Sequence, residues 1–182
     1  MSEGKANLLK RGIAAIFDIY ISSVLANIPV LFIYSIKSGE TQLPSDLSSL
    51  PALSGSLICI MEIIMILVYY VILPVYKFNG QTFMKKLFGF KVVKTDGRNV
   101  DVSTLLKREL LGSMVVEGSF AMSGEYFRQL ILIITGSDPL HKVLVYISYT
   151  LSILSVIFMI FLKNNRALHD FIAGTKVIKV NK

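Results

Sequence analysis

Four apolar stretches divide the chain, and three of them are typical of membrane-spanning helices. Runs 12–36 and 57–76 carry one carboxylate each, Asp18 and Glu62, and run 143–162 carries no charge. They have about 20 to 25 residues each, and about 20 residues of apolar helix cross the roughly 30 Å hydrocarbon core of a bilayer. The pattern therefore predicts at least three transmembrane helices.

The fourth stretch, 110–134, is apolar overall but less uniform. It contains Glu117, Glu125 and Arg128, and three glycines are spaced through it. Such a segment can cross the membrane, break or re-enter part of the way, or lie on the surface as an amphipathic helix. Its hydropathy alone does not decide between these alternatives.

The positions of the basic residues favour a fourth crossing. Three bases precede the first run, eight lie within 77–108 and five follow residue 162. Lysine and arginine near helix ends collect on the cytoplasmic side. All three groups share one side only if 110–134 also crosses. We therefore expect an all-α membrane protein with a four-helix bundle, in which the loop 77–108, the tail 163–182 and both termini are cytoplasmic.

Composition supports this interpretation and excludes other classes. Hydrophobic residues make up 53% of the 182 positions and charged residues 17%, against about 25% charged in soluble domains. The mean hydropathy is +0.63. The net charge of +7 follows from the topology and from contact with anionic lipid headgroups, so no nucleic-acid partner is expected. Cys59 lies inside an apolar run and is expected to be a small core hydrophobe.

The first half of the cytoplasmic loop suggests a short helix on the membrane surface. Residues 82–88 place Phe83 and Leu87 where they can face lipid. Lys85 and Lys86 can then reach headgroup phosphates.

The second half of the loop has the signature of a β-hairpin. Segments 90–94 and 98–102 flank Asp96-Gly97, a strong signal for a tight turn. Because a hairpin of two strands is marginal by itself, we expect the β-branched tail 175–180 to add a third strand.

Three motifs around these runs resemble the RDD family of membrane proteins. They are Arg11 with Asp18, NGQTFMKKLFGFKVV after the second run, and RALHDFIAGTKVI after the last. The residues that name the family are matched to Arg11, Asp18 and Asp170. The other motif residues are Gly80, Gln81, Thr82, His169, Gly174 and Thr175.

The resemblance implies a single membrane domain over 1–182, in the cytoplasmic membrane of a bacterium. It also implies either cation/proton antiport, which is proposed for some members, or an accessory role beside another membrane protein. Met84 departs from the pattern, because similar proteins often have glycine before the basic residues.

Charged groups at membrane depth require an explanation because burying them is costly. Asp18 and Glu117 are predicted at a similar depth, on the order of 10 Å from the cytoplasmic boundary, and Glu62 lies nearer the outer one. None has an obvious basic partner in the membrane, and an unpaired buried carboxyl tends to stay protonated. These three residues are the candidates for an ion or proton pathway, although they can instead hydrogen-bond between helices.

The remaining charges are expected to pair. Glu125 and Arg128 are three residues apart and share a helix face. Asp170 is expected to cap a short helix, or to bind Arg11, Arg108 or Arg166 and so join the two ends of the chain. A metal or catalytic pair of His169 with Asp170 is disfavoured because adjacent residues do not face each other on a helix.

Two functions remain open. The sequence contains no known catalytic or metal-binding motif, so we expect neither an enzyme nor a cofactor. The first function is a transporter that exchanges H⁺ for Na⁺, K⁺ or another solute, expected as a homo-oligomer because short helices enclose little space. The second is an accessory protein that docks onto another membrane protein. Carboxylates that line a wet cavity would favour the first, and carboxylates sealed in helix contacts the second.

Overall fold

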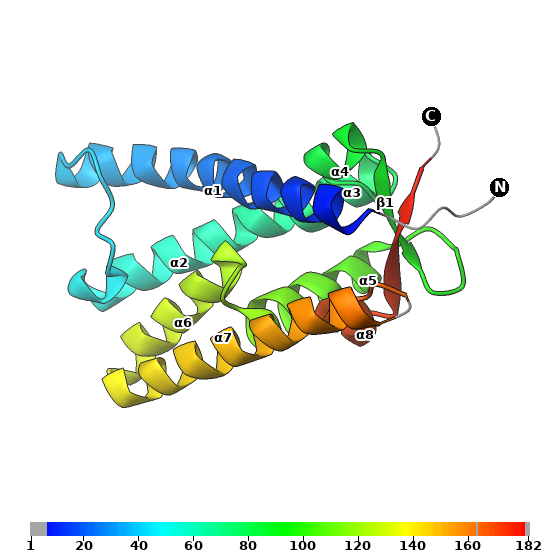
Figure 1. The fold of residues 1–182 in the computed structure, drawn as a ribbon. Helices are drawn as coiled ribbons and strands as arrows, with labels where there is room; N and C mark the ends of the chain where they lie inside the picture. The colour runs from blue at the N-terminus through cyan, green and yellow to red at the C-terminus, as the bar shows by residue number, and fades with distance from the viewer. Residues whose placement is uncertain (1–6, 163, 181–182) are drawn as a thin grey trace.

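The computed structural model describes residues 7–162 and 164–180, and long helices dominate it (Figure 1). The helices are α1 (Leu8–Ser38), η1 (Leu47–Ser49), α2 (Ala52–Leu67), η2 (Val68–Ile72), α3 (Leu73–Tyr76), α4 (Phe83–Leu87), α5 (Val102–Leu106), η3 (Lys107–Glu117), α6 (Met122–Thr135), α7 (Asp138–Phe161) and α8 (Leu168–Ile172). The strands are β1 (Phe90–Lys94) and β2 (Thr175–Lys179).

Within the described residues, three helical segments are long and apolar enough to cross a membrane: Leu8–Ser38, Ala52–Tyr76 and Asp138–Phe161. They contain the three clear apolar runs of the sequence. Large apolar side chains cover their outer faces, and Tyr146, for example, is 71% exposed. A surface of this kind is stable in contact with lipid chains but not with water. The protein is therefore mostly helical, with three candidate membrane-spanning helices and a small sheet.

The fourth predicted segment is broken. The π-helical η3 ends at Glu117, and α6 begins at Met122. Gly118 has a positive φ of 45°, which few side chains tolerate, and its N–H donates to the Ser113 carbonyl over 2.8 Å. Figure 1 shows that η3 leads from the end with the sheet and that α6 continues to the opposite end. A bundle of four continuous helices is not confirmed.

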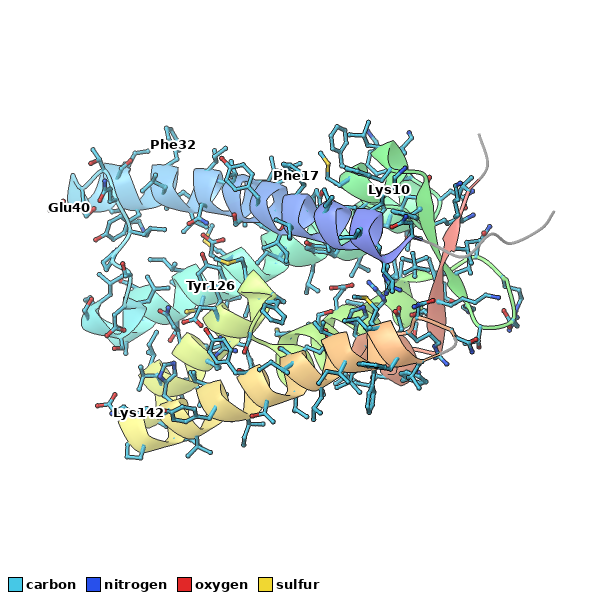
Figure 2. The ribbon with its side chains drawn as sticks, viewed as in Figure 1. Lys10, Phe17, Phe32, Glu40, Tyr126 and Lys142 are labelled. Carbon is cyan, nitrogen blue, oxygen red and sulfur yellow. The ribbon has the colours of Figure 1, made fainter. Side chains whose placement is uncertain are left out.

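The two ends of the molecule differ in what they contain. The strands and the start of α1 lie at one end, together with α4, α5 and α8 (Figure 1). Lys10 lies at this end, whereas Glu40 and Lys142 lie at the other (Figure 2). We refer to the first as the sheet end.

The sheet joins the central loop to the C-terminal tail. β1 and β2 are antiparallel, with Phe90 opposite Lys179 and Lys94 opposite Thr175. The predicted pairing of the tail is thus present, but the predicted strand 98–102 is wrong. Only Asn99 bridges back, to Val93.

The chain leaves strand geometry after that bridge because it starts a helix. The Asp101 side chain caps α5 by accepting the Thr104 N–H over 2.8 Å.

The main apolar core lies between α1, α2 and α6. Cys59 is fully buried there beside Ala26, Ile66 and Tyr126. Its expected role as a core hydrophobe is confirmed. A second, smaller cluster around Val71 and Val92 supports the sheet end.

Candidate functional site

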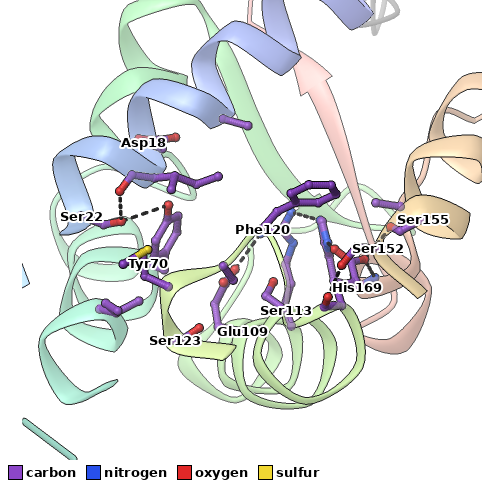
Figure 3. Close-up of a pocket in the computed structure, with 18 of the residues that line it drawn as sticks. Asp18, Ser22, Tyr70, Glu109, Ser113, Phe120, Ser123, Ser152, Ser155 and His169 are labelled. Carbon is purple, nitrogen blue, oxygen red and sulfur yellow. Dashed lines mark hydrogen bonds and ion pairs between the residues drawn. The ribbon is translucent and has the colours of Figure 1, made fainter. Parts of the chain in front are cut away.

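A cavity of about 210 Å³ lies between α1, η3, α7 and α8. Figure 3 shows Asp18, Ser22 and Tyr70 on one side of it and Ser152, Ser155 and His169 on the other. Its charged lining residues are Arg11, Asp18, Lys85, Arg108, Glu109, Glu117 and His169. The cavity therefore brings together ionisable groups from the first helix, the central loop, the broken segment and the tail.

Asp18 is held by donors from two other elements. One carboxylate oxygen accepts the Tyr69 hydroxyl over 2.6 Å and the Met84 N–H over 3.2 Å. The other accepts the Thr82 hydroxyl and binds the Lys85 ammonium over 3.2 Å. Thr82 is the cap of α4, so Asp18 fixes that short helix against α1.

Two expectations are corrected at this point. Asp18 was expected to have no basic partner, and Lys85 to contact headgroups. The Lys85 side chain is instead only 11% exposed and neutralises Asp18, because α4 turns it inward. Lys86 remains exposed, with its ammonium 4.8 Å from the centre of the Phe78 ring.

Asp170 joins both ends of the chain to η3. Its carboxylate binds the Arg11 guanidinium over 2.7 Å and Nε of Arg108 over 3.2 Å, and it accepts the Thr175 hydroxyl over 2.9 Å. Burial by itself would raise the pKa of this carboxyl, but the charges of Arg108 and Arg11 hold it well below its usual value. The expected ion pair between the N-terminal and C-terminal segments is thus present.

Glu117 also has a basic partner, contrary to expectation. Its carboxylate lies 2.8 Å from Nδ1 of His169 and accepts the Ser155 hydroxyl over 2.6 Å. It also accepts the His169 backbone N–H over 2.8 Å, and Ser152 donates to its backbone carbonyl. These contacts tie the end of η3 to α7 and α8.

A glycine allows α8 to approach this site. A Cβ on Gly112 would lie 2.5 Å from the Cβ of His169, well inside van der Waals contact. Only glycine therefore lets η3 carry Glu117 and Arg108 to both sides of the His169 ring.

Glu62 lies apart from the cavity. Its side chain is fully buried in α2, and neither carboxylate oxygen has a hydrogen-bond partner within the described part of the chain. It is not among the residues that line the cavity. The structure thus brings together Asp18 and Glu117, but not Glu62, of the three predicted pathway residues.

Arg128 stabilises the break between η3 and α6. It binds Glu125 over 2.5 Å, as the spacing predicted, and donates to the Gly118 carbonyl over 2.9 Å. It also lies 3.2 Å from the Ser148 hydroxyl. The Arg128 side chain therefore provides a hydrogen-bond donor for a backbone carbonyl at the break between the two helices.

The remaining motif residues support the sheet. The Gly80 carbonyl accepts the Val92 N–H over 2.8 Å, and the Gln81 amide donates to the Phe90 carbonyl over 2.6 Å. Gly174 adopts a positive φ of 63° immediately before β2, and Thr175 is fully buried against Asp170. These residues position the site without lining the cavity.

Sequence reasoning missed several members of the site. Tyr70, Arg108 and Glu109 line the cavity, and Tyr69 binds Asp18, but the sequence singled out none of them for these places. The two tyrosines lie inside the apolar run 57–76, and Arg108 and Glu109 precede the run 110–134, so no local signal marks them and only the tertiary packing brings them to the site. No group of three or more potential ligands among the described residues is placed to hold a metal ion.

Comparison with known proteins places the chain in one family. The sequence pattern of the RDD family matches residues 5–174, which include the first helix, the broken segment and the start of the tail. No curated protein and no solved structure matches the chain. The matched region contains Arg11 of α1, which binds Asp170 of α8, and Asp18 of α1, which binds Lys85 of α4. The chain belongs to the RDD family.

Proposed function

We propose that this protein is an integral membrane transporter that exchanges protons for a monovalent cation such as Na⁺ or K⁺. The observation that supports this proposal is the cavity, which is lined by both Asp18 and Glu117 and lies among the candidate membrane-spanning helices. Ionisable residues at membrane depth that face a cavity are typical of ion and proton pathways.

The proposed topology follows from the two ends of the molecule. The sheet end is cytoplasmic, and η3 with α6 forms a broken fourth crossing of the bacterial cytoplasmic membrane. Non-helical backbone at membrane depth is tolerated where it is buried in protein or lines a cavity. Phe120 and Ala121, within the break, line this cavity. Broken helices of this kind form cation sites in several transporter folds.

Glu117 is the better candidate for the exchanging carboxylate. Four donors, including an ammonium, surround Asp18, so a cation has to displace Lys85 to reach it. Glu117 has an imidazole as its only basic side-chain partner among the described residues. An imidazole loses its charge near neutral pH, whereas an ammonium ordinarily does not. Exchange at Glu117 therefore needs no ion pair with a permanent cation to break.

Proton movement in proteoliposomes tests this function. We expect Na⁺ or K⁺ to collapse an imposed pH gradient with the parent protein, and Glu117→Gln to abolish the effect. Asp18→Asn should reduce the exchange by loosening α4. Asp96→Asn removes an exposed carboxylate of the loop turn and serves as the matched control, with parent activity expected.

If the parent protein is folded and inserted but Na⁺ and K⁺ drive no proton movement, the result would contradict transport. That result would favour the accessory function, in which the charged cluster only fixes the shape of the sheet end. Cross-linking in native membranes would then be the way to identify a partner.

A further inference from the structure

His169 stands between an acidic and a basic side chain, both from η3. Its Nδ1 lies 2.8 Å from the Glu117 carboxylate, and its Nε2 lies 2.7 Å from Nη2 of Arg108. The ring lines the cavity and is partly exposed to it.

These two contacts define the protonation state of the ring. A guanidinium has donors only, so Nε2 has to accept the Arg108 N–H. A neutral imidazole has one donor and one acceptor, so Nδ1 carries the proton and donates it to Glu117. The geometry is consistent with a neutral ring and not with an imidazolium, whose two nitrogens both donate.

We propose that His169 is the proton-binding group of the cavity and that proton uptake there breaks its contact with Arg108. This inference rests on the proposed function, because it names the group that carries the exchanged proton. The incoming proton binds the lone pair of Nε2 that accepted the Arg108 N–H. The hydrogen bond from Arg108 is therefore lost, and no covalent bond other than the new N–H is made or broken.

The surroundings can accommodate both states. Arg108 keeps its other contacts, to Glu109 over 2.8 Å and to Asp170 over 3.2 Å, after the ring releases it. The Asp170 carboxylate lies 3.8 Å from Nε2 and can accept the new N–H after a small movement of the ring. The side chains that face the ring or its partners are therefore Glu117, Arg108 and Glu109 on η3, Asp170 on α8, Arg11 on α1 and Ser155 on α7.

Proton binding at His169 and cation binding at Glu117 then oppose each other. The imidazolium neutralises Glu117, whereas the neutral ring leaves the carboxylate charge available to a cation. By linkage, a cation bound at Glu117 weakens proton binding at His169 by the same factor that the proton weakens cation binding. This reciprocity is the basis of exchange.

Nitrogen NMR of protein with isotope-labelled histidine, reconstituted in lipid, tests the inference without measuring transport. The chain has two histidines, and His141 lies at the start of α7, away from the cavity, so it is the internal control. We expect His169 to carry its proton on Nδ1 at alkaline pH and to gain the second proton on Nε2 as the pH is lowered.

Two variants separate this role from a structural one. Glu117→Gln keeps an acceptor for Nδ1 but removes the charge, so the titration midpoint of His169 should move by about one pH unit or more to lower pH. Arg108→Gln should move it to higher pH. Replacing choline by Na⁺ at constant ionic strength should lower the midpoint in the parent but not in Glu117→Gln.

Three results would overturn the inference: a proton on Nε2 at alkaline pH, no second proton on His169 at any pH at which the protein stays folded, or a midpoint that Glu117→Gln leaves unchanged. Cation-driven proton flux without His169 titration would refute this inference alone. Titration of His169 with the predicted shifts, in a protein that moves no protons, would refute the proposed function instead.

Discussion

At the scale of single residues, Asp170 links α1, η3 and the start of β2. It is fully buried between two arginines from different elements. Removing one partner of a buried ion pair costs about 3–5 kcal/mol, because the other charge stays buried without compensation. We therefore expect Asp170→Asn to lower the thermal unfolding temperature in detergent, whereas Asp96→Asn, at an exposed turn, should leave it almost unchanged. Equal stability of the Asp170 variant and the parent would contradict this role.

The same residue predicts the pH dependence of that stability. The pKa of the Asp170 carboxyl is lower in the folded protein than in the unfolded chain, where it is about 4. The carboxylate therefore stabilises the fold fully at pH values above about 4, and this stabilisation is lost as the pH falls further. When both proteins carry His169→Gln, which removes the titrating ring beside Asp170, the difference in unfolding temperature between the parent and Asp170→Asn should therefore be constant from pH 8 to about pH 5. It should narrow only in stronger acid.

At the scale of elements, the sheet depends on the tail. The Thr95 N–H donates to the Gly174 carbonyl and the Val180 N–H to that of Gly89, which places Val93 among the residues of β1 that bond to β2. The Val92 N–H instead donates to the Gly80 carbonyl. Deleting the chain after Gly174 should thus remove the hydrogen-exchange protection of Val93.

Val92 is the internal control for that deletion. Its protection should fall much less, because its acceptor is outside the deleted tail. Unchanged protection at Val93 would show that the loop holds its structure without β2.

Elements and pairings differ in how far the sequence predicts them. Three helices follow from runs of apolar residues, which are local, and the cap at Thr82 and the pair Glu125–Arg128 are also local. The contacts of Asp18 with Lys85 and of Glu117 with His169 join residues that are far apart in the chain. The periodicity of apolar residues does not indicate contacts between residues so far apart in the sequence. The sequence therefore predicts that both carboxylates are unpaired.

For the hairpin, the local signal predicted more structure than is present. The Asp96-Gly97 turn is present, but the local signal could not show that the tail would take the place beside β1 or that Asp101 would start a helix.

At the scale of the whole molecule, Lys10 and the basic residues of the central loop lie at the sheet end, whereas Lys142 lies at the other (Figure 2). This asymmetry predicts how the protein is oriented in the membrane. In a Cys59→Ala background, Thr41→Cys places a thiol in the exposed connector after α1, and Thr95→Cys places one in the exposed loop after β1. In intact cells, a membrane-impermeant maleimide should label the first and should reach the second only after permeabilisation. The reverse pattern would invert the topology.

Uptake of radioactive sodium ions by proteoliposomes is the most direct test of the central claim, that the cavity couples a cation to a proton. With a proton gradient as the only driving force, we expect the parent to accumulate Na⁺ or, in the matching assay, K⁺ inside acid-loaded vesicles diluted into alkaline buffer. Glu117→Gln should accumulate no more than empty vesicles, and Asp96→Asn as much as the parent. Equal accumulation by Glu117→Gln and the parent, or none by a folded and inserted parent, would contradict the claim.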